Sequence, residues 1–111
     1  ELRELGPSYR GINPEGAARW LEIDHHSRHE ETTGPQPLRD TMTYARLETM
    51  QIPVLMIAGD ADLLSPPAMM RLLANHIPGC EWATVPAAGH AAFWEEPEVW
   101  NSIVLEFIGR H

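Results

Sequence analysis

The sequence of 111 residues has no lysine, a single cysteine and no long hydrophobic run. With only Cys80 present, a scaffold held together by disulfides is excluded. The longest aliphatic stretch, Ile52 to Ala58, is far shorter than the roughly 18 apolar residues of a membrane-spanning helix. All eight basic residues are arginines, and the 16 acidic residues bring the net charge to −8. Phosphate backbones and anionic lipids attract concentrated positive charge, so we expect neither nucleic acid nor membrane as a partner.

The remaining composition is typical of a globular chain, with 43% hydrophobic and 22% charged residues. The length suits one domain or a piece of one. The chain begins at Glu1 with neither an initiator methionine nor a signal peptide. We therefore expect a processed or truncated product with a cytoplasmic location.

The first half of the chain is irregular in pattern. Residues 1–13 are rich in turn signals, and Asn13-Pro14 then marks the start of a helix that we expect to end near Arg28. One face of this helix is expected to be covered: Ala17, Trp20, Leu21 and Asp24. A linker follows over residues 30–41, and residues 44–50 could form a short helix.

The second half has a more regular pattern. The apolar run Val54–Ala58 ends at Gly59 and is typical of a strand buried on both faces of a parallel sheet. A helix should begin at Ser65-Pro66 and end at Pro78-Gly79, a second strand should cover residues 82–85, and a last helix should run from Glu96-Pro97 to Gly109. This order predicts an α/β fold in which two parallel strands are flanked by helices.

Polar residues follow both predicted strands. Asp60 and Asp62 lie in the loop after the first strand, and His90 lies in the loop after the second. Parallel strands bring their carboxyl ends to one edge of the sheet, so a carboxylate and the imidazole can meet there. A carboxylate that accepts from Nδ1–H would leave Nε2 of the histidine to act as a base. We rank Asp62 above Asp60, which is nearer the strand end.

These residues make the chain resemble the C-terminal portion of the α/β-hydrolase fold family. The similarity rests on Ile52–Asp62 with the following Pro66, and on Ala88-Gly89-His90 with Glu96-Pro97-Glu98. It implies that Asp62 is the acid and His90 the base of a catalytic triad. It also implies that residues 1–50 are the end of a helical cap with its return linker, and that residues 51–111 are the C-terminal part of the core.

The nucleophile of such a triad is missing from this sequence. The family carries it upstream on a Gly-x-Ser-x-Gly type of turn between a strand and a helix, and no such turn is present. Ser8, Ser27 and Ser102 do not follow a strand, Ser65 serves better as a helix cap, and Cys80 precedes the second strand. We therefore expect a C-terminal fragment of a hydrolase that is inactive alone, with the substrate and the type of nucleophile left open.

Two other readings remain open. The chain could be a module without catalytic activity that only self-associates, since two parallel strands leave an exposed edge. It could instead bind a metal through His25 and His29, which share a helix face at the spacing of a zinc pair, although a third ligand is not evident. We expect neither a metal nor a cofactor, and we expect either a homo-oligomer or pairing with the upstream half of the parent.

Overall fold

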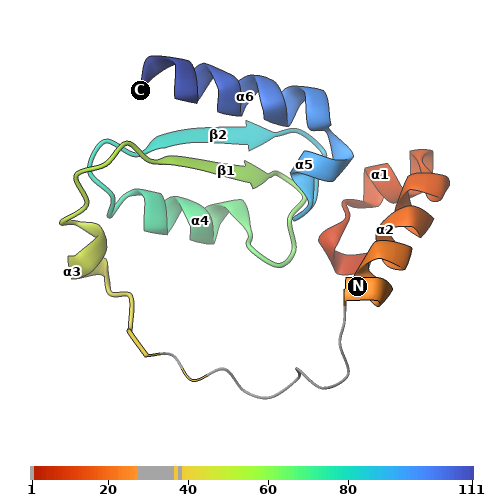
Figure 1. Ribbon diagram of the computed structural model, residues 1–111, viewed down its shortest axis with the longest axis horizontal. Coiled ribbons are helices and arrows are strands. Elements are labelled where there is room, and N and C mark those ends of the chain that lie inside the picture. Colours follow the sequence, from red (N-terminus) through yellow and green to blue (C-terminus); the bar gives the residue numbers. More distant parts are fainter. Residues whose placement is uncertain (1, 28–36, 38) are drawn as a thin grey trace.

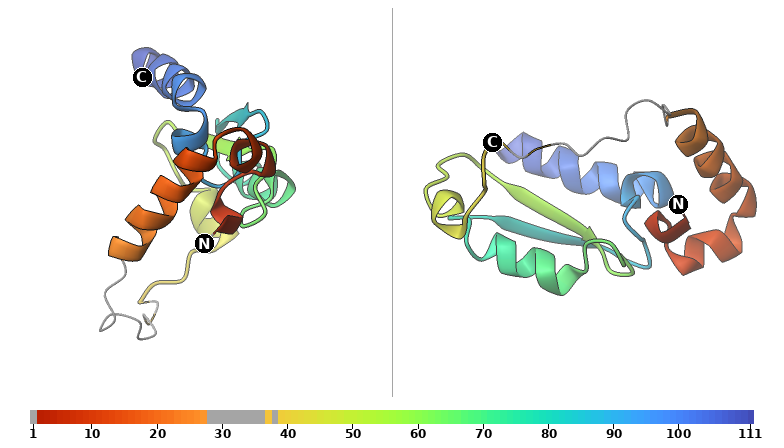
Figure 2. Two further views of the ribbon diagram at one scale, coloured as in Figure 1. Left: turned by 90° about the vertical axis from the view of Figure 1, so that its right-hand side faces the viewer. Right: turned by 90° about the horizontal axis from the view of Figure 1, so that it is seen from below.

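A computed structural model describes residues 2–27, 37 and 39–111. Its centre is a sheet of two parallel strands, β1 (Leu55–Gly59) and β2 (Glu81–Val85), in which Leu55 pairs with Glu81 and Gly59 with Val85. Helix α4 (Pro67–Ala74) covers one face of the sheet and α6 (Pro97–Arg110) the other (Figures 1 and 2). The predicted parallel pair with flanking helices is confirmed.

The N-terminal segment lies beside the end of the sheet toward which both strands run (Figure 1). It comprises a 3₁₀ turn η1 (Leu2–Glu4), α1 (Pro7–Ile12) and α2 (Pro14–Ser27). The short α3 (Tyr44–Leu47) lies at the opposite end, and α5 (Ala92–Glu95) connects β2 to α6. The division into cap residues 1–50 and core residues 51–111 stays a prediction.

Helix α2 begins as the sequence indicates. Oδ1 of Asn13 accepts a hydrogen bond from the backbone N–H of Gly16 at 2.9 Å, which satisfies one donor of the first turn. The covered side of the helix includes the predicted Ala17, Trp20, Leu21 and Asp24, and Ala17 is the most deeply buried of them. Hydrophobic spacing therefore predicted the packed face correctly.

Two local predictions were wrong, and one short helix was not predicted. Residues 7–12 form helix α1 rather than turns, because Pro7 occupies the first helical position and fits its fixed φ. Residues 92–95 form the single-turn helix α5, too short to show a periodic pattern. Helix α4 begins at Pro67, with Pro66 and not Ser65 at the cap position and no side-chain cap.

The hydrophobic core is small and consists mainly of alanines. One cluster contains Leu5, Ala17 and Ala91, and a second contains Val85, Ala88 and Ala92. Leu5 and Val85 are the only large side chains with less than 2% exposure among the residues whose burial is described. Large apolar residues such as Ile52, Leu72 and Leu105 are at least 60% exposed. The chain thus leaves much of its apolar surface uncovered.

Within the described parts of the chain, no helix is long and apolar enough to cross a bilayer.

Candidate active site

Asp62 is buried in the loop that follows β1. Only 6% of the residue is exposed, yet its carboxylate has three partners. Oδ1 accepts hydrogen bonds from the backbone N–H groups of Leu64 at 2.8 Å and Ser65 at 3.0 Å. These bonds close a tight turn and fix the orientation of the side chain, so that Oδ2 is left for another partner.

That partner is His90, in the loop after β2. Its Nδ1 lies 2.9 Å from Oδ2 of Asp62, across 28 positions of sequence. The structure therefore brings together the two residues that the sequence singled out. A carboxylate can only accept, which places the proton on Nδ1 and makes Nε2 the acceptor nitrogen of the neutral ring.

The charge state of Asp62 suits this role. Burial by itself would raise the pKa of this carboxyl, but the hydrogen bonds from Ser65, His90 and Leu64 outweigh it and lower the pKa below its usual value of 3.8. Asp62 is therefore ionised at neutral pH. An ionised, oriented carboxylate stabilises an imidazolium when the histidine takes up a proton.

The far side of His90 is open. Just under half of its side chain, 48%, is exposed. Among the residues that the structure describes, the imidazole ring hydrogen-bonds only through Nδ1, and no group hydrogen-bonds to Nε2. Nε2 can therefore reach a group brought to this edge of the sheet.

The carboxylate of Asp60 contacts the backbone of the second loop and not the imidazole of His90. Its Oδ1 accepts a hydrogen bond from the backbone N–H of Ala87 at 2.6 Å, so it ties the first loop to the second. Its backbone N–H donates to the carbonyl of Val85 at 3.1 Å, and that of Ala61 donates to Ala88 at 2.9 Å. The structure thus separates the two carboxylates: Asp60 joins the loops and Asp62 contacts the imidazole.

Two glycines allow the loops to approach this closely. A Cβ on Gly59 would lie 2.2 Å from the carbonyl oxygen of Gly89, and a Cβ on Gly89 would lie 2.4 Å from the backbone nitrogen of Gly6. Neither glycine has a positive φ. Glycine is needed at these two positions because backbone lies against backbone there, and not because of an unusual backbone conformation.

Glu95 is a buried carboxylate that sequence reasoning missed. It is 5% exposed and accepts hydrogen bonds from the backbone N–H groups of Gly6 and Gly89, at 2.9 Å and 3.0 Å. It lies five residues after His90 in the one-turn helix α5. The sequence offered no signal that separates Glu95 from its neighbour Glu96, because α5 is only four residues long and shows no hydrophobic periodicity.

An aromatic group lies beside the histidine loop. The ring of Trp20 in α2 lies 5.5 Å from that of Trp94 and 6.0 Å from that of Phe93, measured between ring centroids. Trp100 contacts Phe93 at 6.3 Å. Phe93 lies three positions after His90 and is 50% exposed.

Within the described residues, no serine hydroxyl or cysteine thiol hydrogen-bonds to Nε2 of His90. Ser8 lies in α1, Ser27 at the end of α2 and Ser102 in α6, while Ser65 uses its backbone N–H to bond Asp62. Cys80 lies just before β2, at the other end of the sheet. Burial, together with the nearby charge of Glu81, raises the pKa of the Cys80 thiol, although a backbone hydrogen bond at Met56 acts in the opposite direction. The raised pKa keeps the thiol protonated at neutral pH.

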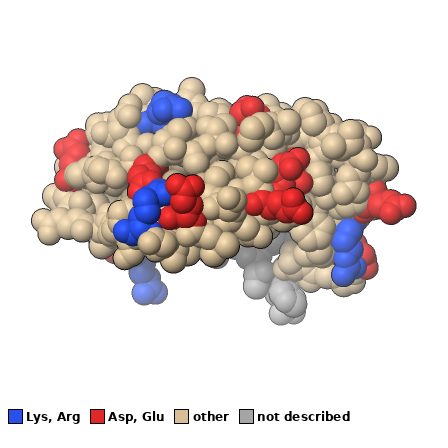
Figure 3. Space-filling model, turned by 90° about the horizontal axis from the view of Figure 1, so that it is seen from above, with Lys and Arg blue, Asp and Glu red and all other residues tan. Residues whose placement is uncertain are grey.

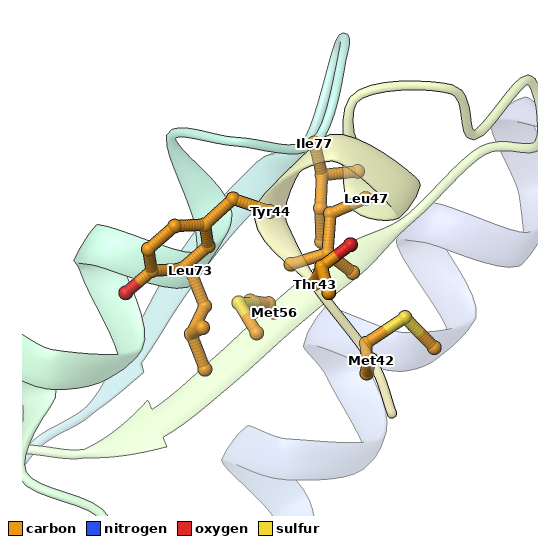
Figure 4. A pocket seen from close by; sticks show the side chains of 7 residues that line it. All are labelled: Met42, Thr43, Tyr44, Leu47, Met56, Leu73 and Ile77. Atoms are coloured by element: carbon orange, nitrogen blue, oxygen red, sulfur yellow. The ribbon is translucent and has the colours of Figure 1, made fainter. Parts of the chain in front are cut away.

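An apolar cavity of about 600 Å³ lies away from this pair. Figure 4 shows its lining around Met56: Met42, Thr43, Tyr44, Leu47, Leu73 and Ile77. Neither Asp62 nor His90 contributes to it, and α3 places it toward the opposite end of the strands (Figure 1). The lining of the cavity contains no carboxylate and no imidazole, so the Asp62–His90 pair remains the candidate for catalysis.

The metal hypothesis involves His25 and His29. His29 lies outside the described residues, so the structure does not place this pair. Among the residues that are described, no group of three or more potential metal ligands comes together.

Charge is dispersed over the face covered by α6. Figure 3 shows acidic side chains in several separate places there, with arginines next to some of them. Arg110 of α6 forms ion pairs with Glu106 and Glu81. The arginines seen on this face do not merge into one basic surface.

Known proteins share both sequence and fold with this chain. A family model described as alpha/beta hydrolase fold matches residues 7–97. Over 55 residues the chain is 38% identical to a candidate non-heme bromoperoxidase, BpoC, of Mycobacterium tuberculosis, which covers 50% of this chain and 21% of that protein. It is 29% identical over 62 residues to the pimeloyl-acyl-carrier-protein methyl ester esterase of Neisseria meningitidis, covering 56% of this chain and 24% of that protein.

A solved structure extends the likeness to nearly the whole chain. A thermophilic esterase from Thermogutta terrifontis superimposes with a TM-score of 0.75 at 21% identity, covering 97% of this chain and 40% of the esterase. The chain therefore spans between a fifth and a quarter of these curated relatives in sequence, and two fifths of the esterase in structure.

Proposed function

The chain belongs to the alpha/beta hydrolase fold family, and we propose that Asp62 and His90 are the acid and base of a hydrolytic triad in a longer protein. Membership of the family confirms the predicted fold class. The observation that carries the catalytic proposal is the 2.9 Å contact between Nδ1 of His90 and a buried, ionised Asp62. The family alone would not identify the chemistry, because this fold supports many reactions.

The proposed chemistry follows from the orientation of the imidazole. Nε2 takes the proton of a nucleophile, which is a serine hydroxyl or, where an aspartate attacks, the water of the second step. The imidazolium then donates that proton to the leaving group or returns it to the nucleophile, while Asp62 stabilises the positive charge. Another segment of the protein supplies the nucleophile and the oxyanion donors. We propose an ester or a related acyl bond as the substrate, in line with the two esterases to which the chain is similar.

The proposal is tested on the complete protein that contains these residues. Hydrolysis of a short p-nitrophenyl ester should be measured for the wild type, for His90→Ala and for the 111-residue chain alone. We expect turnover by the complete protein only, and a loss of at least roughly 10³-fold on His90→Ala. His26→Ala is the matched control, because His26 is an exposed histidine of α2 whose ring hydrogen-bonds to the backbone of its own helix at Glu22. Undiminished hydrolysis by His90→Ala would refute the role of His90.

A second part of the proposal concerns the partner of this chain. We propose that an upstream segment of the same protein pairs with the free edge of β1 and covers the exposed apolar residues. The two-stranded sheet, the small alanine core and the Cα radius of gyration of 16.1 Å support this, since a compact domain of this length has a radius near 13 Å. Self-association of the isolated chain would then be a substitute for the missing contact.

A further inference from the structure

The backbone of the loop that carries His90 is hydrogen-bonded to the buried carboxylate of Glu95. Oε2 of Glu95 accepts the backbone N–H of Gly6 at 2.9 Å, and both carboxylate oxygens lie near the N–H of Gly89, at 3.0 and 3.1 Å. Glu95 therefore joins three segments: the N-terminal turn, the histidine loop and α5. With 5% exposure, its bonds are shielded from competition with water.

The two residues that flank His90 are both fixed by this arrangement. Gly89 donates to Glu95, and Ala91 donates its backbone N–H to the carbonyl of Glu4 at 2.9 Å. Glu4 and Gly6 belong to the same N-terminal segment. The backbone on each side of the imidazole is thus anchored, although the His90 side chain itself is bound only through Nδ1.

The chemistry of the two donors calls for a carboxylate in this position. Both partners of Glu95 are N–H groups, which a carboxylate can satisfy with two acceptor oxygens. The amide of a glutamine has one oxygen and one NH₂ group, so its NH₂ would face one of the donors. With its oxygen at the Oε2 position, the amide would still reach both donors, but its NH₂ group would face the N–H of Gly89, donor against donor. With its oxygen at the Oε1 position, the N–H of Gly6 would be left without an acceptor at a buried site.

We propose that Glu95 is a positioning residue, whose carboxylate holds Gly6 and Gly89 together and thereby sets His90 against Asp62. This rests on the proposed function, in which His90 is the base. Glu95 does not touch the reacting atoms. It acts by fixing the backbone from which the imidazole projects, so its loss should lower the rate of the chemical step more than the affinity for substrate.

The experiment compares Glu95→Gln with Glu98→Gln in the complete protein. Glu98 is exposed in the first turn of α6 and is the matched control. Three measurements are made: the steady-state kinetics (kcat and KM) for a p-nitrophenyl ester, the melting temperature, and the low-field imidazole N–H resonance that His90→Ala removes from the proton NMR spectrum. We expect Glu95→Gln to lower kcat by roughly 10- to 100-fold with KM within about threefold, and to weaken or abolish the resonance in protein that is still folded. Glu98→Gln should leave all three unchanged.

The outcomes separate positioning from general stability. The proposal is overturned if folded Glu95→Gln retains the wild-type kcat and resonance, or if kcat falls only in proportion to the folded fraction. Should Glu95→Gln fail to fold, Glu95→Asp, which keeps the charge but shortens the reach, is judged by the same criteria. If His90→Ala stays active, the proposed function is refuted but the positioning role of Glu95 is not. The effect of Glu95→Gln on the His90 resonance still decides whether Glu95 positions His90.

Discussion

Asp62 and His90 lie 28 positions apart in sequence, yet Nδ1 of the imidazole is 2.9 Å from Oδ2 of the carboxylate. The other oxygen of Asp62 is already engaged by the backbone of Leu64 and Ser65. One side chain therefore serves two purposes: it closes the turn after β1 and it orients the histidine. The turn-capping role of Asp62 and its proposed catalytic role do not compete, because each uses a different oxygen.

The first prediction separates the two carboxylates of this loop. In the complete protein, Asp62→Asn should lower kcat by roughly 10³- to 10⁴-fold, because the amide disturbs both the tautomer of His90 and the stabilisation of its charged form. Asp60→Asn should lower kcat by less than about tenfold, because the Asp60 carboxylate contacts the backbone of Ala87 and not the imidazole. Steady-state ester hydrolysis measures both. Equal losses for the two variants would contradict the assignment.

The second prediction concerns stability and pH. Because folding lowers the pKa of Asp62 below its usual 3.8, its bonds stabilise the folded state above that pH and lose this effect as the pH falls through the lower folded value. Asp62→Asn should thus cost roughly 1–3 kcal/mol at pH 7, and the difference from wild type should shrink below pH 3.8. Urea unfolding of the complete protein at pH 7, 5 and 3 measures this, with Glu98→Gln as the control. A difference that stays constant down to pH 3 would contradict the prediction.

The third prediction uses the glycines of the chain as matched pairs. Gly59→Ala and Gly89→Ala should each destabilise the fold by at least about 1–3 kcal/mol, because the new Cβ would meet backbone atoms at 2.2 and 2.4 Å. Gly11→Ala and Gly109→Ala are the controls, since a Cβ at either position meets nothing within 4 Å. Both controls lie in helices, where replacing glycine by alanine should increase the free energy of unfolding by about 0.5–1 kcal/mol. Chemical denaturation gives the four values, and similar values for all four would argue against the packing of the two loops.

The fourth prediction concerns the isolated chain of 111 residues. With the edge of β1 unpaired and residues such as Ile52 and Leu72 exposed, we expect the chain alone to self-associate. Co-expression with the remainder of the protein should yield a defined complex and suppress the association. Sedimentation velocity distinguishes these states. A monodisperse monomer of the isolated chain over a wide concentration range would contradict the proposed pairing.

Hydrophobic pattern and turn chemistry were enough to predict most of the elements. The run ending at Gly59 predicted β1 to within one residue, and Asn13-Pro14 marked the start of α2 correctly. Helix α6 buries only some of its large apolar side chains. Trp100, Ile103, Val104 and Phe107 are partly buried, whereas Val99 and Ile108 are 38% and 61% exposed. The short helices α1 and α5 escaped prediction because six and four residues carry too little periodicity.

The sequence by itself determined which residues could pair, since a carboxylate and a histidine follow two strands that must run parallel. Only the tertiary structure decided which carboxylate is used, because Asp60 and Asp62 differ in the direction that the turn gives their side chains. Tertiary structure also revealed the role of Glu95. Its partner Gly6 lies 89 positions away along the chain, and its partner Gly89 lies 6 positions away. Local sequence specifies hydrogen bonds between near neighbours, whereas a buried acceptor shared by distant backbone donors exists only after the segments have packed together.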